Sequence, residues 1–432
     1  MDEWIKSGPA LAELLDSRTD MRRERRAGLA IVIPTYRNNA VLEKHLELLS
    51  KQTMKDFDII IVEPKGGAPV GKPEWASILY LGEKGRNGPA GGFYTGELAA
   101  LAEGYPMVVL SDDDAFPESV TLLEDLRRES ESGADVVLPR IMYLPAEKSG
   151  VCRIVQHYGC LKRQVFSRAG LTFLPFFMGG EDVEFLERIT KSGCSVRDID
   201  AMVTHHKRPP FAITSGHEIY HYQRGLMALR VVRGQHYLAW RAFIYNMGMG
   251  AGFILAGRPG LGRDFLLAAW NASGFRLFHD PRGDFEGEPK PLPAGGWKPD
   301  LTLDYKSPLP VPEDFLDNAT AGFLAGRLAW AWRYVSAMPY FFGKRILLID
   351  RGKPLLDLPI MILARGTHVI CEGARFEATP ERGIARIAAG AILMAAIIPL
   401  IFFSATILLA RAVALKSLLG IRSEGYGKNR VK

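Results

Sequence analysis

Residues 106–114, PMVVLSDDD, decide the fold predicted for this chain. The apolar part of the stretch stands between turn residues and three carboxylates, which is typical of a buried strand that ends at a ligand site. In an extended backbone alternate residues share a side, so Asp112 and Asp114 can reach one cation together while Asp113 faces away. Carboxylate oxygens suit Mg²⁺ or Mn²⁺ that carries phosphates. The alternative is an acidic turn that caps a helix starting near Pro117.

Apolar runs and helical spacing alternate before this stretch. Each of three runs bounded by turn residues is expected to be a strand: residues 29–36, 59–62 and 78–81. Residues 39–49, after the first run, have helical spacing. Alternating strands and helices predict an α/β fold with a parallel, doubly wound sheet, in which ligands gather at the carboxyl ends of the strands. Thr35, Glu63 and Asp112 would then share one rim of the sheet.

A glycine-rich block, residues 87–96, follows the third run and leads into a helix. Glycine lets a backbone approach a ligand closely, and a helix N-terminus favours phosphate. The block does not match the spacing of a Rossmann dinucleotide motif, and the sequence has no phosphate-binding lysine motif. By itself, the block is therefore a weak indication of a phosphate site.

Glu181 and Asp182 stand where a glycine turn becomes an amphipathic helix. Two interpretations of Asp182 fit these residues equally well: a cap for that helix, and a general base held at its start. His205 lies at the end of a further expected strand, residues 201–206, which ends in two histidines. A neutral imidazole is a common metal ligand, so this histidine could complete a cation site with the aspartates at positions 112 and 114.

An aromatic and cationic cluster comes shortly afterwards. Tyr220, Tyr222 and Arg224 place rings and a guanidinium close together in the sequence. Such a cluster can hold a sugar or a diphosphate, and it can equally be the start of a packed helix. Both interpretations stay open from the residues alone.

The composition describes a large folded protein with more than one part. The chain has 432 residues, of which 47% are hydrophobic and 24% charged, and this length exceeds one ordinary domain. A net charge of +6 favours anionic partners such as phosphates or acidic lipids without choosing among them. Basic residues gather at both ends rather than along a recognition motif, so we expect no nucleic-acid partner. The four scattered cysteines lack a CxxC pair, which indicates structural thiols and no zinc site.

A membrane segment is expected near the C-terminus. Residues 387–410 are uncharged and stand between Arg386 and Arg411. A helix of this length can cross a hydrocarbon layer about 30 Å thick. Pro399 should kink the helix, so a transmembrane crossing and a re-entrant segment are both open. A buried core helix is the alternative.

Both ends of the chain are basic. Residues 1–27 hold no continuous apolar segment, so we expect a basic helix there rather than a signal peptide. The charge of the tail, residues 411–432, favours the cytoplasm. A single crossing would leave the rest of the chain outside, whereas a re-entrant turn would keep both ends on one side. We expect attachment to the cell membrane with the catalytic domain on its cytoplasmic face.

Five segments, taken in order, resemble the inverting family-2 glycosyltransferases with the GT-A fold. They are IVIPTY at 31–36, NGPAGGF at 87–93, DDD at 112–114, EDVEF at 181–185 and AMVTH at 201–205. The glycine-rich block and the triple aspartate are most similar to the galactofuranosyl- and rhamnosyltransferase branch. The resemblance covers about half of the chain, and it implies a Rossmann-like nucleotide-diphospho-sugar transferase domain over residues 28–235.

The resemblance also implies roles for individual residues. The ligands of Mn²⁺ or Mg²⁺ on the diphosphate of a nucleotide sugar, expected to be a UDP-sugar, would be Asp112, Asp114 and His205. Asp182 would be the catalytic base. Contacts to the donor nucleotide would come from Pro34, Thr35, Tyr36, Glu63, Asn87, Gly91, Gly92 and Asp113. Contacts to the substrate would come from Glu181, Tyr220, Tyr222 and Arg224. Two positions depart from the family pattern, because Gly225 replaces an Asn and Glu63 replaces an Asp in the segment that binds the nucleobase.

The rest of the chain is expected to serve a membrane-attached enzyme. Residues 236–345 would form a helical and loop extension at the membrane interface. Residues 346–380 would form a small β unit, with strands at 346–349, 360–363 and 367–371. The expected function is metal-dependent transfer of a sugar to a lipid-linked or cell-surface glycan. The alternatives are a polyprenyl-phosphate glycosyl synthase and a catalytically silent membrane scaffold that binds glycans.

Overall fold

The chain forms two compact units, each of which is described by itself. The computed structural model describes residues 10–21, 27–36, 39–64, 75, 77–84, 88–144, 153–206, 216–275, 296–304, 336–349, 354–371 and 374–418. The first unit covers Met1–Lys207 and the second covers Arg208–Gly427. The catalytic domain predicted from the sequence ends later, at residue 235.

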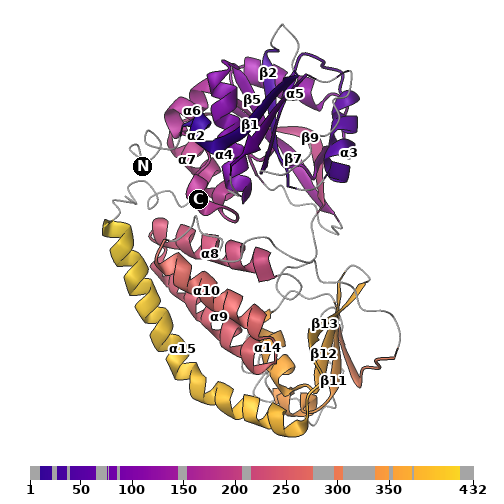
Figure 1. The fold of residues 1–432 in the computed structure, drawn as a ribbon, viewed down its shortest axis with the longest axis vertical. Helices are drawn as coiled ribbons and strands as arrows, with labels where there is room; N and C mark the ends of the chain where they lie inside the picture. The colour runs from indigo at the N-terminus through magenta and orange to yellow at the C-terminus, as the bar shows by residue number, and fades with distance from the viewer. Residues whose placement is uncertain are drawn as a thin grey trace. The chain divides into compact units, whose positions relative to one another are not determined.

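The first unit is built on one sheet. Figure 1 shows this sheet within the first unit, and among the described residues its strands follow the order β1-β4-β3-β2-β5-β8-β7-β9-β6. The strands are β1 Leu15–Met21, β2 Leu29–Pro34, β3 Asp58–Pro64, β4 Ile78–Glu83, β5 Met107–Ser111, β6 Ala115–Pro117, β7 Val136–Leu144, β8 His157–Lys162 and β9 Val196–His206. Strands β4, β3, β2 and β5 are parallel, whereas β8 is antiparallel to both of its neighbours. The predicted α/β fold is confirmed, with antiparallel strands added to the parallel core.

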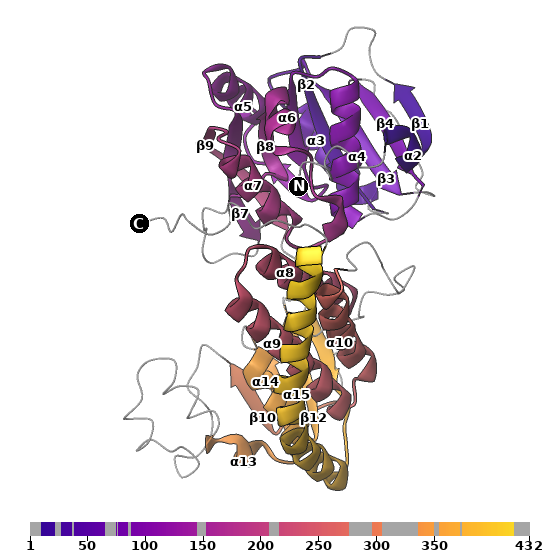
Figure 2. The same cartoon turned by 90° about the vertical axis from the view of Figure 1, so that its left-hand side faces the viewer.

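Helices cover both faces of this sheet (Figure 2). One layer contains α4 Gly88–Ala102, α6 Arg163–Ala169 and α7 Glu181–Lys191, and the other contains α3 Asn39–Ser50 and α5 Leu122–Glu131. Alternate residues of β2 pack into opposite layers, with Val32 in the first and Ile31 in the second. A strand buried on both faces needs a continuous apolar run, and this explains why the central strands were readable from the sequence.

Strand β1 contradicts the prediction of a basic helix over residues 1–27. Within the described part of that range only Leu11–Leu14, helix α2, is helical, and β1 pairs antiparallel with β4 along the edge of the sheet. Arg18 of β1 also donates to a carboxylate oxygen of Glu103 at 2.5 Å. The edge of β4 supplies backbone partners for this segment, and such tertiary pairing overrides a preference inferred from charge alone.

The glycine-rich block is helical rather than a turn. Gly88 has a φ of +65° and begins α4, so the glycines after it lie inside the helix. A Cβ atom at Gly92 would lie 2.6 Å from Cβ of Pro34, and one at Gly96 would lie less than 3.0 Å from Cγ1 of Val32. The close approach that Gly92 and Gly96 permit is therefore between α4 and β2.

The second unit combines helices with a small sheet. Among the residues that the structure describes, its helices are α8 Gly216–Val232, α9 His236–Leu255, α10 Pro259–Ser273, α13 Met338–Phe341, α14 Pro354–Leu363 and α15 Ile384–Leu418. Its strands, in sheet order, are β10 Leu301–Asp304, β11 Arg345–Ile349, β12 Gly366–Cys371 and β13 Ala374–Thr379. Much of the interfacial extension predicted over 236–345 lies outside the described residues.

One predicted strand of the second unit is wrong. Residues 360–363 lie in α14, whereas the strands predicted at 346–349 and 367–371 are present as β11 and β12. Helix α14 packs against α9 and α15. A short apolar run has the same composition in a buried helix as in a buried strand, so periodicity alone could not separate the two structures.

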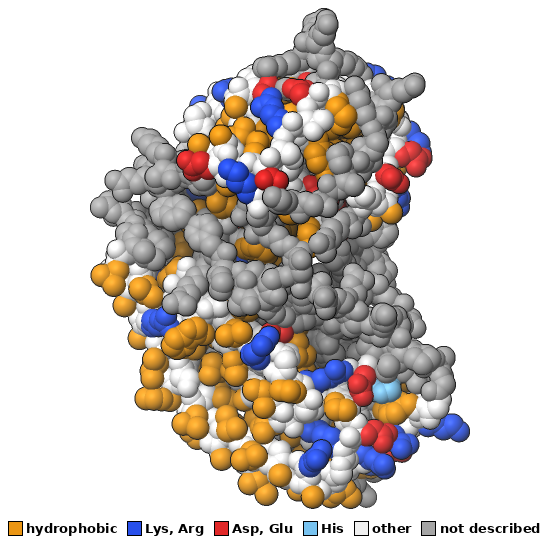
Figure 3. Space-filling model, in the orientation of Figure 1, with side chains coloured by type: hydrophobic (Ala, Val, Ile, Leu, Met, Phe, Trp, Pro, Cys, Tyr) orange, Lys and Arg blue, Asp and Glu red, His pale blue; other side chains and the backbone are white. Residues whose placement is uncertain are grey.

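Helix α15 is the one helix in the described part of the chain that is long and apolar enough to cross a membrane, with a mean hydropathy of 2.6. Pro399 lies inside it without ending it. One side of α15 packs against α8, α9, α10 and α14. The other side leaves large apolar side chains exposed, among them Ile392, Leu393, Leu400, Phe403 and Ile407. Figure 3 shows hydrophobic side chains gathered over this unit, and only 17% of the most apolar part of α15 is buried. A core helix would be buried on all sides.

Candidate active site

The candidate site starts where β2 and β5 end side by side. β3 flanks β2 on one side and β5 on the other, so the order of strands reverses between β2 and β5. Ligands of open α/β sheets bind outside the carboxyl ends of the strands at such a point. Thr35 follows β2, is 6% exposed, and donates from Oγ1 to Oδ2 of Asp113 at 2.8 Å. The two strand ends are thus joined by a hydrogen bond to a carboxylate.

The three aspartates after β5 face different partners. An oxygen of Asp112 lies 3.5 Å from Nδ1 of His157, and an oxygen of Asp114 lies 3.1 Å from Nε2 of His205. Asp113 bonds instead to Thr35. The alternative of an acidic helix cap is wrong, because β6 follows the aspartates and α5 begins only at Leu122.

His157 is a site residue that the sequence reasoning missed. Donor atoms of Asp112, His157 and His205 all lie within 4.8 Å of one another, a spacing that can hold one metal ion. The rings of the two histidines stack with centroids 4.4 Å apart. His157 is the first residue of β8, a strand that no periodic pattern in the sequence predicts. His157 reaches the site because β8 pairs with β5, and this pairing cannot be read from the sequence.

The donor set fits a divalent cation. Two imidazoles and one carboxylate meet at this point, and Asp114 contacts the second imidazole, His205. Burial lowers the pKa of His157 to about 3, which keeps its ring neutral and able to donate an electron pair. Of the predicted ligands, Asp112 and His205 belong to this group of donors directly, and Asp114 reaches it through His205.

Electrostatics place the start of α7 near the same aspartates. The pKa of Asp112 is raised well above its usual range, first by burial and then by the negative charges of Asp114, Asp113, Glu181 and Asp182. Carboxylates that perturb one another in this way lie close together. The structure therefore gathers residues from after β5 and from the beginning of α7 in one strongly negative place, which favours a cation.

Two glycines set the entry into α7. Gly179 and Gly180 have φ values of +90° and +100°, which a glycine adopts without strain. Glu181 after them is buried, and Oδ1 of Asp182 accepts a hydrogen bond from the backbone N–H of Val183 at 2.7 Å. The positive end of the helix dipole stabilises an ionised carboxylate here. The N-cap of α7 is Gly180 and has no side-chain capping bond, so the interpretation of Asp182 as a helix cap is wrong, while its role as a base stays a prediction.

The side chain of Glu63, a predicted nucleotide contact, is buried in the core and hydrogen-bonded there. It lies near the end of β3, is 3% exposed, and accepts a hydrogen bond from the hydroxyl of Tyr80 on β4. Burial and then this contact raise the pKa of Tyr80. The carboxylate thus faces the neighbouring strand, and its predicted contact with a nucleobase stays untested.

The other predicted nucleotide contacts lie near the same rim. Pro34 ends β2, and Tyr36 after it is 44% exposed. Gly91 and Gly92 lie in the first turns of α4, a helix that follows β4. Asn87 lies outside the described residues.

The aromatic and cationic cluster belongs to the second unit. Tyr220 and Arg224 lie one turn apart on α8, both fully buried, with the guanidinium 5.1 Å from the centre of the Tyr220 ring. The Tyr220 hydroxyl accepts a hydrogen bond from Nδ2 of Asn271 on α10 at 2.5 Å. Tyr222 is 43% exposed. Tyr220 and Arg224 thus take part in helix packing, and the substrate role of the cluster stays a prediction.

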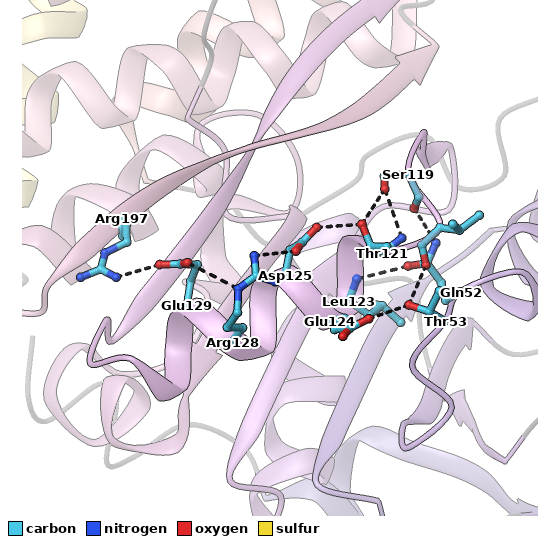
Figure 4. Close-up of polar contacts among 11 residues, drawn as sticks. Gln52, Thr53, Ser119, Thr121, Leu123, Glu124, Asp125, Arg128, Glu129 and Arg197 are labelled. Carbon is cyan, nitrogen blue, oxygen red and sulfur yellow. Dashed lines mark hydrogen bonds and ion pairs between the residues drawn. The ribbon is translucent and has the colours of Figure 1, made fainter.

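An acidic recess of about 600 Å³ lies elsewhere on the first unit, between α5 and β9. Its carboxylates are already paired: Asp125 lies 2.6 Å from Arg128, and Glu129 lies 2.8 Å from Arg197 (Figure 4). Such a network is a structural connection between α5 and β9. The candidate site is therefore the one at the aspartates.

Comparison with known proteins supports the resemblance over part of the chain. A stretch of 102 residues, 22% of the chain, is 36% identical to galactofuranosyltransferase GlfT1 of Mycobacterium tuberculosis. A stretch of 100 residues is 34% identical to the GlfT1 of Mycolicibacterium smegmatis. The predicted resemblance to galactofuranosyltransferases is confirmed. The chain spans about a third of the length of these curated relatives, 33% and 32%. No family model matches the chain.

Two solved structures share a limited similarity with the chain. S. aureus TarS has a TM-score of 0.36 and 14% identity, and the match covers 47% of this chain and 39% of TarS. The mannosyltransferase PcManGT from Pyrobaculum calidifontis, solved with GDP-Man and Mn²⁺, has a TM-score of 0.35 and 14% identity. That match covers 63% of this chain and 77% of PcManGT.

Proposed function

We propose that the chain is a metal-dependent, inverting glycosyltransferase that uses a nucleotide-sugar donor, with UDP as the nucleotide. The observation that carries the proposal is the gathering of residues from after β2, after β5, the end of β9 and the start of α7 around Asp112. The similarity to proteins named galactofuranosyltransferases supports it and makes a galactofuranosyl donor the first to test.

The residues divide the chemistry of a direct displacement between two groups. A divalent cation held by Asp112 and His205 would stabilise the negative charge of a departing diphosphate. Asp182, at the start of α7, would take the proton of the acceptor hydroxyl. The bond from Thr35 fixes the carboxylate of Asp113 at the rim, where the donor nucleotide would lie. One displacement without a covalent intermediate inverts the anomeric configuration.

We propose a lipid-linked or cell-surface glycan as the acceptor, and the cell membrane as the location, with the catalytic unit on the cytoplasmic face. The exposed apolar side of α15 supports membrane attachment. At one end of this apolar stretch the guanidinium of Arg411 lies 4.2 Å from the centre of the Trp270 ring. Arginine and tryptophan are the side chains that sit at a lipid–water interface. An acceptor with a lipid tail would stay at the same surface.

The test is sugar transfer by the purified full chain in detergent or nanodiscs. UDP-galactofuranose and other UDP-sugars are offered with and without Mn²⁺, together with glycosylated and bare polyprenyl phosphates, and the anomeric configuration of any product is read by NMR. We expect an inverted product on a glycosylated acceptor that requires the metal and is lost in Asp112→Asn. Transfer only to bare polyprenyl phosphate would indicate a polyprenyl-phosphate glycosyl synthase. Absence of both transfer and donor binding would favour the catalytically silent scaffold.

Asp200→Asn is a matched control for that variant. Asp200 lies on β9 and its side chain is 84% exposed, with a surface ion pair to Arg140 at 2.9 Å. Its removal tests whether loss of any carboxylate of this unit impairs transfer. We expect the control to retain the activity of the wild type, because an exposed ion pair of this kind contributes little to stability.

A further inference from the structure

His157 lies among the donor atoms of the candidate metal site, although the family resemblance gives it no role there. One donor atom from each of His157, Asp112 and His205 lies within 4.8 Å of the other two, and the side chain of His157 is 7% exposed. The stacking of the two imidazoles at 4.4 Å brings a second ring nitrogen to the same point. The resemblance assigns a single histidine to the metal.

The backbone around His157 is shaped to place that ring. The pairing of β5 with β8 shifts register between Leu110 and Ser111, and the shifted residue Ser111 is opposite His157. An irregularity of this kind next to a site re-aims a side chain. The backbone N–H of Asp112 donates to the carbonyl of Gln156 at 2.8 Å, which ties the segment before His157 to the first aspartate.

The residue after His157 is held in a costly conformation. Tyr158 has a φ of +65°, in the left-handed region that residues other than glycine rarely adopt. Its hydroxyl is hydrogen-bonded to Nε2 of His45 at 2.5 Å, and both side chains are fully buried. Such strain persists only where the surroundings hold it, and it concentrates at functional sites. Here the strained residue directly follows His157.

We infer that His157 is a direct ligand of the divalent cation, and that two imidazoles make this site selective for transition ions over Mg²⁺. The inference rests on the metal-dependent function proposed above. Imidazole nitrogen is a good ligand for first-row transition ions, whereas Mg²⁺ prefers oxygen ligands and keeps several waters. Asp114, 3.1 Å from His205, would orient that imidazole as an outer partner. The affinity order expected for this donor set is Co²⁺ above Mn²⁺, and Mn²⁺ above Mg²⁺.

The competing interpretation is that His157 only supports the ring of His205. A supporting residue would influence the site through packing, so its replacement would weaken all three ions alike. A ligand contributes its own nitrogen, so its replacement would weaken Co²⁺ and Mn²⁺ much more than Mg²⁺. The two interpretations also differ in the number of nitrogens on the ion.

The experiment measures metal binding by the full chain, with no turnover. Pulsed EPR of the Mn²⁺-loaded wild type counts coordinated imidazole nitrogens, and calorimetry gives the affinities for Co²⁺, Mn²⁺ and Mg²⁺. The variants are His157→Gln and His205→Gln. The control is His368→Gln, because His368 is also a buried histidine stacked on an aromatic ring, Trp297, with centroids 3.7 Å apart, and it belongs to the second unit.

We expect two imidazole nitrogens on Mn²⁺ in the wild type and one in His157→Gln. Loss of an outer partner of a metal ligand lowers affinity about 10–100-fold, so loss of a ligand should lower that for Co²⁺ by at least as much, with a far smaller change for Mg²⁺. His368→Gln should bind as the wild type does. One nitrogen in the wild type, or equal losses for the three ions in His157→Gln, would overturn the inference while leaving the metal site itself in place. No binding of any ion by the wild type, with or without a UDP-sugar, would overturn both the inference and the metal dependence proposed above. The nitrogen count needs only the wild type, so a variant that fails to fold does not prevent the decision.

Discussion

Replacement of Gly96 by alanine should destabilise the first unit without weakening the binding of a donor. A Cβ atom at this position would meet Cγ1 of Val32 at less than 3.0 Å and Cγ2 of Val62 at 3.2 Å, both on buried strands. Overpacking of a core in this way costs about 1–3 kcal/mol. The better helix propensity of alanine offsets about 1 kcal/mol of that cost. The net loss is about 0–2 kcal/mol, or a fall in Tm of up to roughly 8 °C for a unit of this size.

The assay is thermal denaturation of the full chain followed by calorimetry, with Gly248→Ala as the matched control. Gly248 lies within α9 and has open space where a Cβ would be added, so alanine there should stabilise by about 1 kcal/mol. Donor affinity is measured on the same samples. An unchanged or raised Tm for Gly96→Ala, together with a loss of donor affinity, would refute the packing account and return this glycine to a role at a phosphate.

Three further predictions follow from the contacts of single side chains. Burial raises the pKa of Glu97 from 4.5 to about 7 despite hydrogen bonds from Thr172, so the folded state holds this proton more tightly than the unfolded state. Stability from Glu97 is therefore complete below about pH 4.5 and falls by about 3 kcal/mol as the pH rises to about 7, and denaturation of Glu97→Gln should lack this fall. Thr35→Val removes the bond to the carboxylate of Asp113 and should lower the free energy of unfolding by about 1.5–3 kcal/mol and weaken donor binding; no change in either quantity would show that the bond is not formed. The double change Ile392→Asp and Phe403→Asp on the exposed side of α15 should shift the protein from floating vesicles to the soluble fraction. Each substitution replaces about 2 kcal/mol of apolar burial with a charge that costs about 3 kcal/mol in hydrocarbon. Unchanged flotation would show that this side of α15 does not contact the membrane.

The parallel core of the first unit could be predicted because its strands are buried on both faces. Each of β2, β3, β4 and β5 is a continuous apolar run closed by turn residues, and this local pattern suffices. Strand β1 is mostly exposed along its length and exists by pairing with an edge, so its residues carry no apolar signal. Residues 360–363 show the opposite failure, since an apolar run is present but the surrounding helices decide its conformation.

The sequence predicts the site residues that directly follow a strand, but not a residue whose position depends on the pairing register of its strand. Asp112 and His205 stand at strand ends, so the topology alone brings them to one rim. His157 reaches the same place through a register shift and a left-handed residue, neither of which leaves a mark in the sequence. Gly92 and Gly96 indicate a close approach of the backbone, and the sequence alone does not tell whether the partner is a ligand or a strand. The position of β2 beneath α4 shows that the partner is the strand.

The central claim is that Asp182, at the start of α7, is the general base for the acceptor hydroxyl beside the metal site of the aspartates. The variant Asp182→Asn tests this claim most directly. We measure kcat for transfer and the Kd of the donor in the presence of Mn²⁺, with the variant's fold checked by its Tm. Loss of a general base should lower kcat by about 10²–10⁴-fold while the Kd of the donor stays within about threefold of the wild type. A kcat equal to that of the wild type would contradict the account.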